Sequence, residues 1–332
     1  MTFRPLKLVF FSLLTGLLLA GLTTWGALAL FFLAPGPPAL RSGLAIAYGF
    51  FGLLATAGWF LRSWRRLAGI TFGLLLLPVL AVYNSAEPRN DRDWQPDVAL
   101  LPYATFDGDR VTVHNIRNFD YRSETDYIPA YYDRTFDITR LDRVDLVAAY
   151  WMGPEVAHLF LTFGFGADHL AISIEARKDK TRPYATLPGF FRQYELVYVV
   201  GDERDVIRLR TNYRADPPEQ LYLYPLKIPI DNGRRIFLEY VRDMNALREH
   251  PRFYNTLTTN CTTMILKHAM VNPDHVPYSW KVLLSGYGPE YLYDMGRLDR
   301  TLPFAELRDR AHINAAARAA DQSLEFSRLI RK

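Results

Sequence analysis

Cysteine is the scarcest residue in this chain, which has one, Cys261, among 332 residues. A single thiol cannot close an internal disulfide, so the fold has to rely on its core. Structural zinc sites need several cysteine or histidine ligands at short spacing, and the seven histidines here are scattered. We therefore expect no metal ion and no other cofactor.

Several functional motifs are also missing. There is no glycine-rich phosphate loop and no Gly-x-Ser-x-Gly nucleophile motif. The net charge is only +4, and no basic run resembles a surface that follows nucleic-acid phosphates. Binding to nucleic acid is therefore not expected.

Charge is absent from most of the first quarter of the chain. Residues 8–40, 42–61 and 67–86 contain no charged side chain, and each run reaches the ~20 apolar residues that a bilayer requires. We predict three membrane-spanning helices. A cleaved signal peptide is the alternative for the first run, but this run is longer than a usual signal-peptide core and two more follow it.

Basic residues predict the orientation of these helices. Two precede the first helix and three fill the loop between the second and third, whereas the first loop contains only Arg41. By the positive-inside rule the N-terminus is cytoplasmic, and three crossings place the rest of the chain outside. In a bacterium this corresponds to the inner membrane with a periplasmic domain.

The composition divides the chain into four parts: a transmembrane anchor at 1–86, a polar linker at 87–93, a soluble domain at 94–295 and an amphipathic helical tail at 296–332. Alternating and helical patterns predict an α+β fold with an antiparallel sheet. The expected strands are 110–116, 143–151, 157–165, 169–177, 196–200, 206–210 and 221–226. The expected helices are 231–249, 260–271 and one between about 303 and 330. Residues 201–205 read as a solvated turn between two strands.

Cys261 lies where a helix should begin. Thr258, Thr259 and Asn260 are good N-cap residues, and the apolar run after Thr263 continues as a helix. The unpaired N–H groups of a first helical turn favour a thiolate, which is the nucleophilic form of cysteine. Cys261 is therefore a candidate nucleophile, and a buried structural cysteine remains the alternative.

A thiol nucleophile usually needs a histidine base held by a third polar group. His268 is two turns along the same helix, ~10 Å from Cys261, which is too far. His158 opens an apolar strand and needs a partner. If the following hairpin closes with a two-residue loop, Glu175 lies opposite or diagonal to His158 on one face and can hold its ring. A three-residue loop would turn Glu175 away.

The chain resembles a known bacterial family in several motifs. They include the run that begins at His158, Ile174-Glu175-Ala176-Arg177, Gly201-Asp202-Glu203-Arg204-Asp205 and Thr259-Asn260-Cys261-Thr262-Thr263. Over residues 94–290 these resemble the family of the periplasmic domain of Lnb, a lipoprotein N-acyltransferase. The order of histidine, hairpin and cysteine helix is similar to that of circularly permuted papain-like (NlpC-like) proteins, whose membrane-associated members include lecithin retinol acyltransferase.

The resemblance implies an acyl-enzyme on Cys261 formed from a lipid ester, with His158 as base and Glu175 as the orienting residue. Asn260 and Thr262 are the expected oxyanion or positioning residues. The expected partners are a membrane lipid and the N-terminus of a lipoprotein. Lnb-like enzymes have further transmembrane helices after the periplasmic domain, whereas here three precede it, so the acceptor stays open. A cysteine peptidase or amidase acting on envelope peptides and a non-catalytic scaffold are the alternatives, and the sequence does not indicate the oligomeric state.

Overall fold

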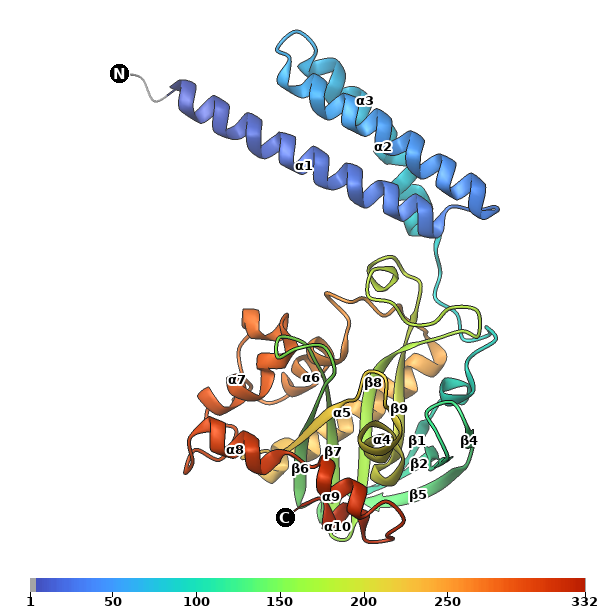
Figure 1. Cartoon of the computed structure of the whole chain (residues 1–332), viewed down its shortest axis with the longest axis vertical. Helices are drawn as coiled ribbons and strands as arrows, with labels where there is room; N and C mark the ends of the chain where they lie inside the picture. The colour runs from blue at the N-terminus through green and yellow to red at the C-terminus, as the bar shows by residue number, and fades with distance from the viewer. Residues whose placement is uncertain (1–3, 332) are drawn as a thin grey trace. The chain divides into compact units, whose positions relative to one another are not determined.

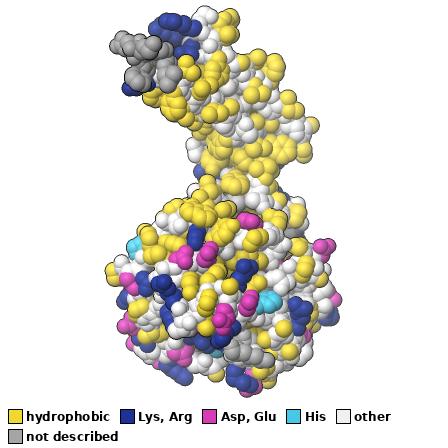
Figure 2. Space-filling view, turned by 60° about the vertical axis from the view of Figure 1, so that its left-hand side comes forward, with side chains coloured by type: hydrophobic (Ala, Val, Ile, Leu, Met, Phe, Trp, Pro, Cys, Tyr) yellow, Lys and Arg dark blue, Asp and Glu magenta, His cyan; other side chains and the backbone are white. Residues whose placement is uncertain are grey.

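The computed structural model describes residues 4–331 and separates the chain into two compact units (Figure 1). The first unit consists of residues 4–88 together with 185–193, and the second of residues 89–184 and 194–331. The surface of the first unit is mostly hydrophobic, while charges of both signs cover the visible face of the second (Figure 2). The two units therefore have the surfaces of a membrane segment and of a soluble domain.

Three helices form the first unit: α1 (Arg4–Leu33), α2 (Pro38–Phe60) and α3 (Arg65–Ser85). All three are long and apolar enough to cross a membrane, as the sequence predicted. The 23 residues of α2 extend over roughly 34 Å at 1.5 Å per residue, which exceeds the ~30 Å hydrocarbon core of a bilayer. We conclude that the chain is a multi-pass membrane protein.

Small residues bring α1 and α2 close together. A Cβ atom added to Gly52 would lie 2.7 Å from the side chain of Thr23, so only glycine allows this approach. The segment 185–193 completes the unit: the ring of Phe191 stacks on Phe32 with centroids 5.3 Å apart, and Arg192 donates from Nη1 to the Tyr83 carbonyl at 2.7 Å. This segment connects two strands of the second unit, so the two units are joined there as well as through residues 86–93.

The second unit contains an eight-stranded sheet with the order β1-β2-β9-β8-β7-β6-β10, in which β5 also pairs with β2. These strands are β1 (Tyr103–Asp107), β2 (Arg110–Arg117), β5 (Tyr131–Asp137), β6 (Arg143–Tyr150), β7 (Ala157–Phe165), β8 (Asp168–Arg177), β9 (Glu195–Asp202) and β10 (Gln220–Pro225). A small separate hairpin is formed by β3 (Asp120–Tyr121) and β4 (Tyr127–Ile128). The expected strands at 110–116, 143–151, 157–165, 169–177, 196–200 and 221–226 are confirmed to within two residues at their ends.

The sheet is mixed, so the expectation of an antiparallel sheet holds for every pair in it except one. β2 runs parallel to β9 at Arg117 and Gly201, whereas the other pairs are antiparallel. A parallel pair needs a long connection rather than a tight turn, and the chain between β2 and β9 supplies one. Strand patterns along the sequence do not show this pairing, because it joins segments about 80 residues apart.

Helices cover both faces of the sheet (Figure 1). On one face the apolar side of α5 (Ile230–Glu249) and Met264 of α6 (Cys261–Ala269) pack on alternate residues of β6, β7 and β8. On the other face lie α4 (Glu203–Arg208), α9 (Asn314–Ala319) and α10 (Phe326–Leu329). Two further helices, α7 (Gly288–Asp294) and α8 (Phe304–Ala311), precede α9. The domain therefore has three layers, helix, sheet and helix.

Residues 203–213 are helical, so the expected strand at 206–210 and the solvated turn before it are wrong. Asp202 caps α4 by accepting a hydrogen bond from the Arg204 N–H, and a π-helical turn, Leu209–Tyr213, follows. Acidic residues in a first helical turn after an Asp cap are a helix signal. Val206 and Ile207 are both buried against the sheet, which a strand with alternating faces does not allow.

The C-terminal segment forms three short helices rather than the single one expected. Between α8 and α9 the chain becomes extended, and the Ile313 N–H donates to the Leu221 carbonyl at 3.0 Å, on the open edge of β10. Pairing this edge satisfies backbone groups that would otherwise be exposed. Phe326 and Ile330 are buried in the core beneath the sheet, so the segment is an integral part of the domain.

A buried ion pair links β2 to α4 and should be essential to stability. The Asp205 carboxylate is fully buried and accepts hydrogen bonds from Arg117, from the Phe119 N–H at 2.7 Å and from the Tyr121 hydroxyl at 2.9 Å. Replacing it leaves the buried Arg117 charge without its carboxylate partner, which costs about 3–5 kcal/mol. We expect Asp205→Ala to lower the midpoint of thermal unfolding of the detergent-solubilised protein by roughly 10 °C.

The control for this change is Asp107→Ala, which removes an exposed carboxylate and should alter the stability by less than about 0.5 kcal/mol. Equal unfolding midpoints for the two variants would contradict the structural role of Asp205.

Candidate active site

The helix α6 begins at Cys261 because Asn260 caps it. The Asn260 side chain accepts a hydrogen bond from the Thr263 N–H at 2.9 Å, and the Thr263 hydroxyl accepts one from the Asn260 N–H at 2.9 Å. This reciprocal capping box fixes the first turn. The Asn260 amide also donates to the Thr256 carbonyl at 2.7 Å. Cys261 is thus held in the first helical position, among backbone N–H groups that have no partner within the helix.

The thiol of Cys261 is partly buried and lies against the first residues of β7. Burial raises the pKa of the Cys261 thiol, but the charge of the His158 ring and a hydrogen bond from it, together with the Leu159 N–H and the Thr262 hydroxyl, lower this pKa to about 7. An unperturbed cysteine titrates near 8.5. A large fraction of Cys261 is therefore thiolate at neutral pH, which is typical of reactive cysteines.

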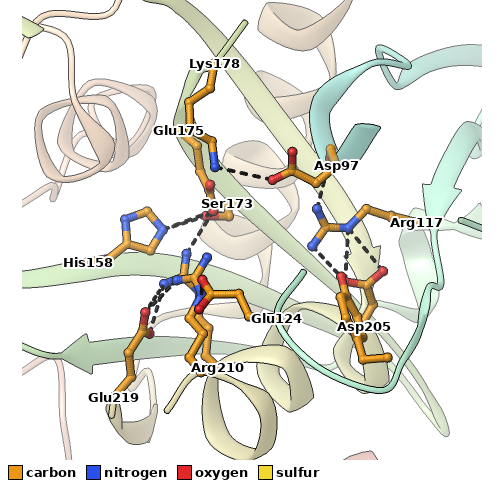
Figure 3. Close-up of polar contacts among 12 residues, drawn as sticks. Asp97, Arg117, Glu124, His158, Ser173, Glu175, Lys178, Asp205, Arg210 and Glu219 are labelled. Carbon is orange, nitrogen blue, oxygen red and sulfur yellow. Dashed lines mark hydrogen bonds and ion pairs between the residues drawn. The ribbon is translucent and has the colours of Figure 1, made fainter. Parts of the chain in front are cut away.

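The hairpin of β7 and β8 positions His158 next to Glu175. Its loop has two residues, Gly166 and Ala167, as the triad hypothesis required, and Phe165 pairs with Asp168. The His158 Nε2 atom lies 2.6 Å from the Ser173 hydroxyl and 3.6 Å from Glu175 Oε1 (Figure 3). The structure thus brings together Cys261, His158 and Glu175, and it adds Ser173 between the last two.

Glu175 is anchored from its other side by Arg210, whose Nη2 atom lies 3.0 Å from Glu175 Oε1. Arg210 in turn contacts Glu219 at 3.0 Å (Figure 3). Glu219 also pairs with Arg214 at 2.5 Å. Burial acts to raise the pKa of Glu175, but the positive charges of Arg210 and then His158 outweigh it and hold this pKa well below the usual range. Glu175 is therefore ionised at neutral pH.

The ionised Glu175 determines which nitrogen of His158 carries the proton. A carboxylate can only accept, so the Ser173 hydroxyl, 2.9 Å from Glu175, donates its hydrogen to Glu175. The Ser173 oxygen must then accept from His158 Nε2–H. In the neutral ring this leaves Nδ1 unprotonated and able to accept a proton from the thiol.

Asn260 and Thr262 flank the nucleophile in different ways. The amide of Asn260 is occupied by the capping box and by Thr256, so this side chain positions Cys261. The Thr262 hydroxyl is 3.7 Å from the Cys261 sulfur and the residue is buried. The backbone N–H of Cys261, at the start of the helix, is a further donor that could hydrogen-bond to an oxyanion.

The other histidines near the core have different partners. His268 is buried, with Nε2 2.6 Å from the Tyr198 hydroxyl, and its ring packs 4.5 Å from that of Tyr240. Burial lowers the pKa of His268 to about 4, so it is neutral at pH 7. His114, in β2, contacts Asp133 at 2.7 Å in an exposed part of the sheet. Among residues 4–331, no group of three or more His, Cys, Asp or Glu side chains is arranged to hold a metal ion.

Three contributors to this site were missed from the sequence. Ser173 lies two residues before Glu175 on the same face of β8, so the strand alternation could have indicated it. Arg210 was assigned to a strand, and nothing in the local sequence links it to Glu175, 35 residues away. The Leu159 N–H is a backbone group, which no side-chain pattern reveals.

Residues 127–286 match a family model, the Lnb N-terminal periplasmic domain. The chain carries an Lnb-type periplasmic domain. This match includes His158, Ser173, Glu175, Arg210 and Cys261, so the whole candidate site lies within the Lnb-type domain. No curated protein and no solved structure was found to match the chain.

The pKa of the thiol gives a direct test of the contact between Cys261 and His158. With His158→Ala, burial still raises the thiol pKa while the charge that lowers it is lost, so the pKa should move from about 7 to above its ordinary value. Because the thiolate is the reactive form, alkylation by iodoacetamide at pH 7.5 should slow at least about tenfold. Mass spectrometry measures this cleanly, since Cys261 is the only cysteine.

The matched control for this measurement is His250→Ala, which removes an exposed histidine at the end of α5 and should leave the pH profile of alkylation unchanged. An inflection that stays near pH 7 in the His158→Ala protein would show that the histidine does not activate the thiol.

Proposed function

We propose that the Lnb-type domain is a cysteine-dependent acyltransferase that takes an acyl chain from a membrane phospholipid and transfers it to the N-terminal amine of a lipoprotein-like acceptor. The observation that carries this proposal is the convergence of Cys261 and His158, 103 positions apart in the chain, with a thiol pKa of about 7. Nucleophile, base and orienting carboxylate within reach of one another are the elements of covalent acyl transfer.

In the first half-reaction His158 Nδ1 takes the thiol proton and the Cys261 sulfur attacks the carbonyl carbon of the lipid ester. The negative charge that develops on the carbonyl oxygen is stabilised by the backbone N–H of Cys261. The intermediate then collapses, the C–O bond of the ester breaks, and His158 returns the proton to the departing glycerol oxygen. The products are a lysophospholipid and a thioester on Cys261.

In the second half-reaction the acceptor amine attacks the thioester and gives a proton to His158. The C–S bond breaks, the thiol regains its proton, and an amide is released. Ser173 and Glu175 keep the imidazole in the required tautomer and stabilise its cation in both halves. If water replaces the amine as acceptor, the same residues catalyse hydrolysis of the lipid.

Attachment to the membrane supports a lipid substrate. The domain is joined to the helical unit by residues 86–93 and again by the segment 185–193. A site held beside the bilayer meets phospholipid at a high effective concentration. We place the N-terminus in the cytoplasm and the domain in the periplasm of a bacterium, on the distribution of basic residues. We also propose that the domain is a permuted papain-like fold, because its cysteine begins a helix that packs on the strand bearing the histidine.

The acyl-enzyme can be tested with the full-length protein in liposomes of phosphatidylethanolamine that carries a radiolabelled acyl chain. We expect label on the protein, release of this label by neutral hydroxylamine, which cleaves thioesters, and transfer to a diacylglyceryl-cysteine peptide. The Cys261→Ala protein should acquire no label and transfer none, because Cys261 is the only thiol.

Two results would overturn the proposal. Unchanged acyl transfer by a folded Cys261→Ala protein would show that Cys261 is not the nucleophile. Cysteine-dependent cleavage of cell-wall peptides without any labelled thioester would indicate a peptidase or amidase. A thiol that is not alkylated at neutral pH would instead support a scaffold with an inert cysteine.

The contribution of Glu175 can be measured through the rate of acyl transfer. Glu175→Gln keeps the shape of the side chain but removes the charge that holds His158, so we expect the rate to fall by roughly 10²-fold, within the range of general acid–base catalysis. The matched control is Asp133→Asn, which removes the carboxylate that contacts His114 and should leave the rate unchanged. Equal rates for the two variants would contradict an orienting role for Glu175.

A further inference from the structure

An apolar cavity lies between α6 and the strands β6 and β7. One wall is a single face of α6, formed by Thr262, Ile265, Leu266 and Ala269, whose spacing of three and four residues repeats with the helix. Leu159 and Leu161 of β7 form much of the opposite wall. The cavity therefore follows α6 from its first turn to its last.

The cavity begins beside the candidate nucleophile. Thr262 lines it directly after Cys261, with its hydroxyl 3.7 Å from the sulfur. Leu159 lines it directly after His158, and the Leu159 N–H hydrogen-bonds to the Cys261 sulfur. Gly288 lies on the same wall, where a Cβ atom would come within 2.7 Å of the Leu159 side chain. The lining of the cavity therefore begins one residue after each of the two candidate catalytic residues.

Polar groups at the far end of the cavity limit its apolar length. Beyond the last turn of α6, Asp274 accepts hydrogen bonds from the Asn232 amide at 2.7 Å and from Arg297 at 3.2 Å. From Cys261 to Ala269 the helix advances by about 12 Å at 1.5 Å per residue. An extended hydrocarbon chain advances ~1.3 Å per methylene, given C–C bonds near 1.5 Å, so about nine methylenes fit in this length.

We infer that this cavity binds the acyl chain of the substrate, with the carbonyl at Cys261 and about the first nine methylenes along α6. An unbranched hydrocarbon chain is favoured over a peptide, because peptide N–H and C=O groups would lose their hydrogen bonds to water against these apolar walls. Each buried methylene should strengthen binding roughly fourfold. The inference rests on the proposed function for the reaction that delivers the chain, but binding of the chain does not require the thiol.

Two variants can shorten the cavity at different depths. Ile265→Phe fills it one turn from Cys261, after about four methylenes, and Ala269→Phe fills it two turns away, after about nine. We would measure kcat/KM of the full-length protein in mixed micelles with thioesters of 4, 8, 12 and 16 carbons. The wild type should gain activity up to about ten carbons and then level off.

The two variants should differ in where this gain stops. Ile265→Phe should lose most activity on the 8-carbon and longer thioesters and keep it on the 4-carbon thioester. Ala269→Phe should keep its activity on 4- and 8-carbon thioesters. Its kcat/KM should fall at least tenfold on thioesters of 12 and 16 carbons. The control is Lys267→Phe, which adds the same ring on the exposed side of α6, outside the cavity, and should not alter the profile.

Binding to the inactive protein separates this inference from the proposed function. Decanoic acid should displace cis-parinaric acid from the full-length Cys261→Ala protein. Adding Ala269→Phe to this protein should weaken the binding of decanoic acid at least tenfold. If this holds while no acyl transfer occurs, the acyl site stands and the proposed function fails. If acyl transfer occurs but neither variant changes its chain-length profile, or if folded Ala269→Phe protein binds decanoic acid normally, the acyl site is wrong. Ala269→Leu, a smaller change, serves if the phenylalanine variant unfolds.

Discussion

The candidate site depends on the ion pair between Glu175 and Arg210. Arg210 is buried between two carboxylates, those of Glu175 and Glu219, and a buried guanidinium is tolerated only when such partners surround it. The pair fixes Glu175 in its ionised form. Glu175 then dictates the direction of the Ser173 hydrogen bond, which sets the tautomer of His158, and His158 lowers the pKa of Cys261. Removing Arg210 would therefore affect Glu175, Ser173, His158 and Cys261 in turn.

Rigid elements present each of these groups. The two-residue loop of the β7–β8 hairpin sets the parity that places His158 and Glu175 on one face, and a one-residue change would separate them. The capping box at Asn260 fixes the first turn of α6, and with it Cys261. Arg210 is held in the π-helical turn that follows α4. The apolar residues of α4 are buried against the side of the sheet that faces away from α6. The site thus uses four segments that are held together by the sheet.

The same sheet separates two kinds of environment. On the α6 side, an apolar cavity runs along the helix from Thr262 to Ala269. His158, Glu175 and Arg210 form a charged network on the side of the sheet that α4 covers. The charged network around His158 therefore lies apart from the face of α6 that lines the cavity. The chain also carries three helices that are long and apolar enough to cross a membrane, which anchor the domain.

The sequence by itself determined the three membrane helices, most strands, α5, α6 and the cap at Asn260, because these follow from local patterns of polarity and capping. It also indicated Cys261, His158 and Glu175, since a hairpin with a short loop is a local structure. The tertiary structure alone decided that β2 pairs with β9, that Ile313 covers the edge of β10 and that Arg210 reaches Glu175. These contacts join residues far apart in the chain, and each one pairs a buried charge or an open backbone edge with a distant partner, which no local pattern records.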